Sequence, residues 1–263
     1  ADFGLRIAPH DDRGYMSIES EQLVLDSMLS DLAIKTAEEL TLPHSESLVY
    51  LVNDFVNETD SKRTAIYSVA AGVDFEQLAK WPGEKLLDEG SPLPADDEIV
   101  LDDWIAEDLG LKKGESLRLK YFLVDNHGGT TEKERVFTVH SVIPLEKARL
   151  TTDRGLVPAV RGITDVKNFR DLRQPFPMNL DPLTDRDDAY WAEHGPTPKV
   201  FLPLAVAQEM WETRHGRLTS IRVFQQDDQD LGSLTRQFEK RLLKKIDVKD
   251  ANLAFLPVKY LGV

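Results

Sequence analysis

The chain has 263 residues, 41% of them hydrophobic, and a formal net charge of -14 at neutral pH. Its length and apolar content suit one large globular domain or two ordinary ones. The lack of cysteine excludes disulfides and thiol catalysis, the apolar runs are far shorter than the ~18 residues of a membrane-spanning helix, and the acidity disfavours binding to nucleic acid.

The first third of the chain predicts one helix and one β-hairpin. Apolar residues spaced three or four apart between residues 21 and 41 are typical of an amphipathic helix, which should end near Pro43. Two runs rich in β-favouring residues follow, Ser47 to Val56 and Thr64 to Val73. The polar loop between these runs indicates a hairpin of buried strands.

Two stretches rich in proline and glycine, Trp81 to Asp97 and Gly195 to Pro198, predict segments that cross between domains. They bracket a piece of domain size. We therefore expect residues 95–198 to form a β-rich subdomain inserted into a parent subdomain, which residues 1–94 and 199–263 build together. The acidic charge of the first part and the net basic charge of the last part favour this association.

Inside the expected insertion, a short helix and a hairpin are predicted. Asp102 or Asp103 is suited to cap a helix that runs through Leu109, and Gly110 is suited to the left-handed residue that ends it. The alternating apolar pattern and the turn residues that follow predict a hairpin with strands at residues 116–123 and 135–143 and a turn at Asn126–Gly129. Residues 147–198 predict mostly loops.

The last part of the chain predicts two helices and two strands. Pro203 suits the first position of a helix, and Leu231, Leu234, Phe238 and Leu242 are spaced for a second, amphipathic helix. Strands are expected at Leu218–Phe224 and Leu253–Val258. The fold class is therefore α+β, with strands and longer helices interleaved in the two end segments.

The sequence presents few residues for chemistry. The six histidines, at positions 10, 44, 127, 140, 194 and 215, lack the spacing of a zinc site. The acidic run from Asp181 to Asp188 offers oxygen ligands for Ca²⁺, but it lacks the register of a calcium loop, and solvated acids explain it equally. We predict no catalytic residue, no bound metal and no cofactor.

The predicted helix from Asp230 to Ile246 is the one strongly basic element. Cations near a helix C-terminus are favoured by its dipole, which is one interpretation. Contact with anionic lipid or with an acidic partner is the other. The basic side chains concerned are Arg236, Lys240, Arg241, Lys244 and Lys245.

The stretch IVLDDWIAEDLGLKKGESLRLKYFLV at residues 99–124 resembles a corner found in the extracytoplasmic domains of ABC-transporter permeases of the MacB and FtsX-like family. TPKVFLPLAVAQEMW at 197–211, LTSIRV at 218–223 and AIYSVAAGV at 65–73 resemble segments of the same domains. The resemblance implies a mixed α/β subdomain like the porter modules of efflux pumps, interrupted by a β-rich subdomain.

For function, the resemblance implies a periplasmic, or otherwise extracytoplasmic, domain of a cytoplasmic-membrane protein without a chemical step of its own. ATP-driven motion of the membrane helices would pass through it to a substrate or partner outside the membrane. The partners implied are a cytoplasmic ABC ATPase, which acts through the transmembrane part, and a second permease copy. The alternatives are a free-standing extracytoplasmic binding or adaptor protein and an enzyme with a metal-assisted acidic site.

Overall fold

The computed structural model describes residues 4–81, 85–124, 129–146, 149–172, 178–211, 213, 216–226 and 229–246. These residues form an α+β fold, as the sequence predicts. The strands are β1 Leu5–His10, β2 Tyr15–Ser20, β3 His44–Asn57, β4 Thr64–Val73, β5 Glu98–Asp102, β6 Ser116–Val124, β7 Thr130–Ile143, β8 Val200–Pro203 and β9 Ser220–Phe224. The α-helices are α1 Ser27–Glu39, α2 Phe75–Ala79, α3 Asp103–Leu109, α4 Asp185–His194, α5 Leu204–Trp211 and α6 Leu231–Leu243.

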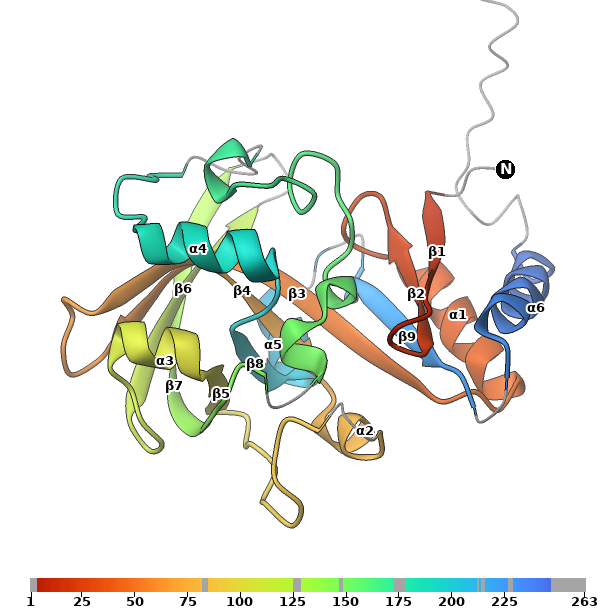
Figure 1. Ribbon diagram of the computed structural model, residues 1–263, viewed down its shortest axis with the longest axis horizontal. Helices are drawn as coiled ribbons and strands as arrows, with labels where there is room; N and C mark the ends of the chain where they lie inside the picture. The colour runs from red at the N-terminus through yellow and green to blue at the C-terminus, as the bar shows by residue number, and fades with distance from the viewer. Residues whose placement is uncertain are drawn as a thin grey trace, which may run out of the picture.

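Strand β3 joins the two halves of a single sheet with the order β1-β2-β9-β3-β4-β8-β5-β7-β6. Its first residues, from His44 to Ser47, pair with β9, and its last, from Asp54 to Asn57, pair with β6. Because β6 pairs with β3 as well as with β7, the six strands from β3 to β6 in this order close into a barrel. Strands β1, β2 and β9 form an open extension, and β3 runs from that extension into the barrel (Figure 1).

Alternate residues of the barrel strands fill its core. Ile99 and Leu101 of β5 belong to the largest apolar cluster, whereas Val100 between them belongs to a separate one, as expected when successive side chains point to opposite faces of a strand. Helices α3 and α5 add buried side chains to the same core, including Ile105 and Met210. The barrel is therefore a packed body and not an open pore.

The open extension has a core of its own. Helices α1 and α6 lie beside each other against β1, β2 and β9 (Figure 1), and the apolar faces of both helices contribute to one cluster. Phe238 of α6 is fully buried in it, and Leu234 and Leu242 lie one turn away on either side. The amphipathic patterns of the two helices thus cover one face of the extension.

Several sequence predictions are confirmed. The hairpins β3–β4 and β6–β7 form, and β9 and α6 lie where they are expected. Asp102 caps α3 by accepting the Ile105 N–H at 2.8 Å, and Gly110 ends the helix with φ 63°. The prediction for Pro203 is wrong by one position, because Pro203 ends β8 and α5 begins at Leu204.

Three further predictions concern residues outside the described ranges or the division of the chain into subdomains. The strand predicted at Leu253–Val258 and most of the turn predicted at Asn126–Gly129 lie outside the described residues. The division into residues 1–94, 95–198 and 199–263 stays a prediction. Strands of its first and last segments pair in three places: β2 with β9, β3 with β9 and β4 with β8.

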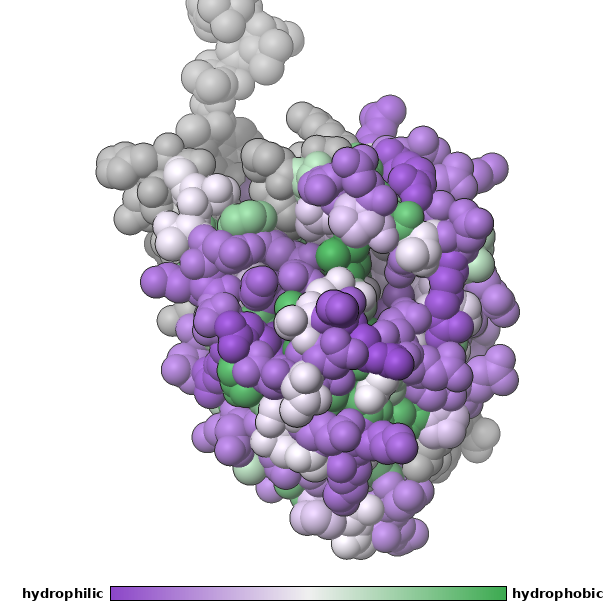
Figure 2. Space-filling model, turned by 90° about the vertical axis from the view of Figure 1, so that its left-hand side faces the viewer, coloured by the Kyte–Doolittle hydropathy of each residue, from purple (hydrophilic) through white to green (hydrophobic). Residues whose placement is uncertain are grey.

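In the described ranges, every helix is too short or too polar to span a lipid bilayer. The view onto the end of the barrel that carries α3 and the β3–β4 hairpin shows a largely hydrophilic surface, on which the apolar areas are small and lie mostly in recesses (Figure 2). Scattered apolar areas of this kind are normal on globular proteins, so this face presents no broad apolar interface.

Candidate functional site

Within the region predicted as loops, the described residues 149–172 and 178–198 cross the outside of the sheet and include α4 (Figure 1). We call them the covering segment. Thr184 caps this helix in a reciprocal arrangement with Asp187, whose side chain accepts the Thr184 N–H at 3.0 Å. The acidic run considered as a calcium ligand set thus contains the beginning of a helix, from Asp185 onward, where carboxylates meet the positive end of the dipole. Among the described residues, no group of three or more acidic or histidine side chains is arranged to hold a metal ion.

Arg186 of α4 fastens this helix to α3. Its guanidinium lies 2.8 Å from an oxygen of Asp108 and 2.7 Å from one of Glu107, and it stacks over the Trp104 ring at 4.3 Å from the centroid. A planar guanidinium suits this combination of ion pairs and ring contact. The two short helices are therefore held as a pair although about eighty residues separate them in the chain.

Lys199 is the most deeply buried lysine among the described residues, with 5% of its surface exposed at the entrance to β8. Its ammonium lies 4.0 Å from Asp187 and 4.1 Å above the centre of the Tyr190 ring. Burial lowers the pKa of Lys199, since the charged form loses its hydration, while Asp102, Asp187 and Asp108 oppose that change.

Asp102 is the carboxyl that burial perturbs most in this cluster. It is fully buried, its Oδ1 accepts only the capping hydrogen bond from Ile105, and its Oδ2 has no hydrogen-bond partner among the described residues. Burial raises the pKa of Asp102 to about 7, against the opposing effects of that hydrogen bond and of Lys199. Part of the population is therefore neutral at physiological pH.

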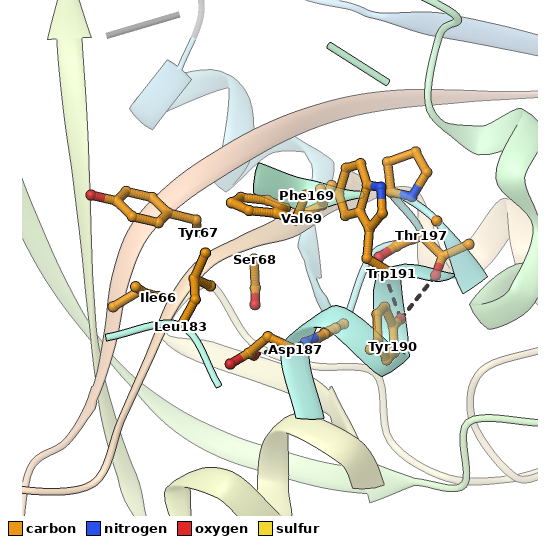
Figure 3. Close-up of a pocket in the computed structure, with 13 residues that line it drawn as sticks. Ile66, Tyr67, Ser68, Val69, Phe169, Leu183, Asp187, Tyr190, Trp191 and Thr197 are labelled. Carbon is orange, nitrogen blue, oxygen red and sulfur yellow. Dashed lines mark hydrogen bonds and ion pairs between the residues drawn. The ribbon is translucent and has the colours of Figure 1, made fainter. Parts of the chain in front are cut away.

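A small cavity of about 20 Å³ opens beside these charges (Figure 3). Asp187, Lys199 and Ser68 line it, and so does Tyr190, whose hydroxyl lies 2.8 Å from Thr197 Oγ1. Burial raises the pKa of Tyr190 well above its usual range. A space of this volume holds about one water molecule. It admits no organic substrate to the lysine, so the cluster acts as an anchor for α4.

Tyr67, on β4, borders the same cavity in a strained backbone conformation. Its φ of 48° is unusual for a residue other than glycine, and the regular β3–β4 register skips its position. The hydroxyl accepts the Asn179 N–H at 2.8 Å and the ring stacks on Phe169, so the strain turns Tyr67 toward the covering segment. Strain of this kind costs on the order of 1–3 kcal/mol and persists where the surroundings impose it.

A second buried network holds the beginning of the covering segment. Arg222 of β9 is 1% exposed and lies 3.6 Å from Asp153, which also accepts hydrogen bonds from the Tyr15 hydroxyl at 2.8 and 2.9 Å. Arg222 additionally donates to Ser45 of β3 at 3.0 Å. The segment is therefore tied to the open extension by Asp153 and to the barrel side by Arg186 and Lys199.

The residues singled out in the sequence are not brought together. His10 bonds Ser17 at 3.0 Å, His140 lies in the buried part of β7, and His194 ends α4, while His127 and His215 lie outside the described residues. Sequence reasoning missed Lys199 and Tyr67. For Lys199, the available sequence signal was a lone lysine directly before the apolar residues of β8. The sequence carries no comparable signal for Tyr67.

Of the basic residues on α6 and directly after it, two pair with α1. Lys245 lies 2.8 Å and Arg241 3.5 Å from Glu39, and both ion pairs lower the pKa of that carboxyl, the hydrogen bond from Lys245 most. Exposed pairs of this kind contribute little to stability. These pairs fit the interpretation in which the cations stabilise the helix and its packing. Lys240 and Lys244 are the residues at which contact with anionic lipid or an acidic partner can be tested.

Comparison with protein-family profiles gives no match, and comparison with curated proteins gives none either. Among solved structures, the periplasmic region of MacB from Actinobacillus actinomycetemcomitans aligns with 80% of this chain and 72% of its own, with a TM-score of 0.40 and 12% sequence identity. Similarity at this level does not define a function.

Proposed function

We propose that this chain is an extracytoplasmic domain of an ABC-transporter permease, and that it relays ATP-driven movement of membrane helices to a substrate or partner outside the membrane. The proposal starts from the sequence resemblance at residues 99–124. Those residues form β5, α3 and β6, with Asp102 and Gly110 at the ends of the helix. In this role the chain carries out no chemical step.

The continuity of β3 carries the proposal. One strand of 14 residues, about 45 Å long at ~3.3 Å per residue, pairs with β9 at its beginning and with β6 at its end. A displacement of the open extension therefore reaches the barrel through backbone hydrogen bonds. The covering segment, with Asp153 at one end and Arg186 at the other, makes a second connection between the same two parts.

Localisation and partners are tested with the full-length gene product. We expect an apolar run of about 20 residues on each side of these 263 residues, since a domain between membrane helices requires them. A protease site inserted beside the exposed Lys62, in the β3–β4 turn, should be cut in spheroplasts and protected in intact cells. A gene product without apolar runs that is released by osmotic shock would instead be the free-standing adaptor.

The relay is tested by distance measurement. These 263 residues contain no cysteine, so Lys62→Cys gives one spin label per permease copy once any cysteines in the rest of the transporter have been replaced. We expect the label-to-label distance to change by several ångströms between the nucleotide-free and the ATP-trapped transporter. An unchanged distance, in a complex that still hydrolyses ATP, contradicts the relay without affecting the localisation.

A further inference from the structure

A cavity beside the covering segment has the dimensions of a small-molecule site. It has a volume of about 530 Å³ and lies between residues 154–168 and the end of α4. Ligand pockets commonly measure about 300–1,000 Å³. Trp191, which also borders the water-sized cavity of Figure 3, forms one wall.

A second, apolar cavity of about 50 Å³ lies on the other side of the same wall. The two cavities share Val157, Thr164, Trp191 and Pro196, and the smaller one reaches further to the face of β3 and β4. Its remaining lining is almost entirely aliphatic and aromatic. Apolar cavities stay dry and accept apolar groups, and a volume of about 50 Å³ suits one or two methyl-sized groups, such as the end of an alkyl chain.

The larger cavity has a net positive lining. Arg154 and Lys167 border it together with one carboxylate, Asp165, whose Oδ1 is engaged by the Gly162 N–H. Arg154 donates from Nη2 to the Glu193 carbonyl at 2.7 Å, which leaves its other donors for a ligand. Lys167 is exposed and has no ion-pair partner among the described residues. In a chain of net charge -14, two cations at one cavity are a distinctive feature.

We propose that the two cavities form one binding site for a small anionic amphiphile, a carboxylate or sulfonate with an apolar group. The anion lies near Arg154 and Lys167, where a guanidinium and an ammonium recognise it. The apolar group lies in the larger cavity against Val157 and Trp191, and its end reaches into the smaller cavity. The proposal is independent of the permease assignment, because it uses only contacts within this chain.

The site is tested on the 263-residue chain with the fluorescent sulfonate 8-anilinonaphthalene-1-sulfonate and with octanoate. We expect saturable enhancement of the probe fluorescence, and displacement of the probe by octanoate at concentrations where octylammonium and octanol leave it bound. Displacement by octylammonium as strong as that by octanoate overturns the anionic specificity.

Two variants separate a defined site from general adsorption. Lys167→Glu should raise the Kd of the sulfonate at least tenfold, whereas Lys112→Glu, the same reversal on an exposed turn away from the cavities, should change it less than twofold. Ile163→Phe, which fills the smaller cavity that Ile163 lines, should weaken octanoate more than acetate.

The urea midpoint of each variant is measured in parallel, so that a partly unfolded chain is not mistaken for a binder. The proposal is overturned if Lys167→Glu and Lys112→Glu change the Kd of the sulfonate equally. It is also overturned if Ile163→Phe lowers the affinities for octanoate and acetate by the same factor. Binding without saturation overturns it as well.

Discussion

The raised pKa of Asp102 gives the strongest test of the buried cluster, because it makes the stability of the folded chain depend on pH. Burial raises its pKa from an ordinary 3.8 to about 7 in the folded chain. Between these values the folded state binds more protons at this carboxyl than the unfolded state does, so stability falls as the pH rises through this window. A pKa shift of about three units corresponds to roughly 4 kcal/mol, by which the free energy of unfolding falls between pH 4 and pH 7. A chain without this carboxyl lacks that pH-dependent loss.

Asp102→Asn removes the ionisation and keeps an oxygen that accepts the Ile105 N–H, because asparagine caps helices as well as aspartate does. We expect the difference in unfolding free energy, variant minus wild type, to increase by about 4 kcal/mol between pH 4 and pH 8. The measurement is urea unfolding followed by tryptophan fluorescence. Any effect of the substitution that does not involve ionisation displaces the whole variant curve by a constant, so the pH dependence carries the test.

Asp97→Asn is the matched control, since Asp97 is an exposed aspartate five residues earlier whose neutralisation should leave the wild-type pH dependence intact. Parallel curves for wild type and Asp102→Asn, with a difference constant to about 1 kcal/mol over the same pH range, would refute the reasoning. They would mean that Asp102 is solvated or stably paired.

Three further outcomes are expected. Gly110→Ala should lower the Tm, because φ is +63° there and a Cβ would lie 2.5 Å from Arg63, whereas Gly232→Ala inside α6 meets only ordinary contacts and should raise it. Phe238→Ala should cost about 3–5 kcal/mol in urea unfolding, since Phe238 is fully buried, whereas truncation of the half-exposed Leu243 should cost far less. Lys240→Glu should leave sedimentation with anionic vesicles unchanged if the basic residues of α6 serve only the helix, and a loss of binding would favour the lipid interpretation.

Features set by neighbouring residues could be predicted from the sequence. The α3 cap, the left-handed Gly110 and the two hairpins depend on interactions across a few residues or one turn, and they form as expected. The beginning of α4 carried the same kind of signal, with Thr184 followed three residues later by Asp187. That signal was missed because the carboxylates around it also fit a calcium ligand set.

The buried cluster could not be predicted because it depends on positions far apart in the chain. Lys199 is buried because β8 lies between β4 and β5 and because α4 covers its ammonium, and no local pattern specifies either placement. The same holds for Arg222, which the sequence presents as an ordinary polar position in a strand. Its role follows from Asp153 and Ser45, which lie about seventy and about 180 residues away in the chain.

These long-range contacts also bear on how movement would pass through the molecule. A sheet joined by β3 alone could twist at the junction, since β3 has different partners at its two ends. The covering segment spans that junction, and breaking a buried ion pair on one side leaves an uncompensated charge that costs about 3–5 kcal/mol. We therefore expect Asp153→Asn to loosen the open extension relative to the barrel, with faster amide exchange in residues 149–157 and β9 and unchanged exchange in β6 and β7. Faster exchange in all four would mean that the network stabilises the whole fold uniformly and does not control this junction.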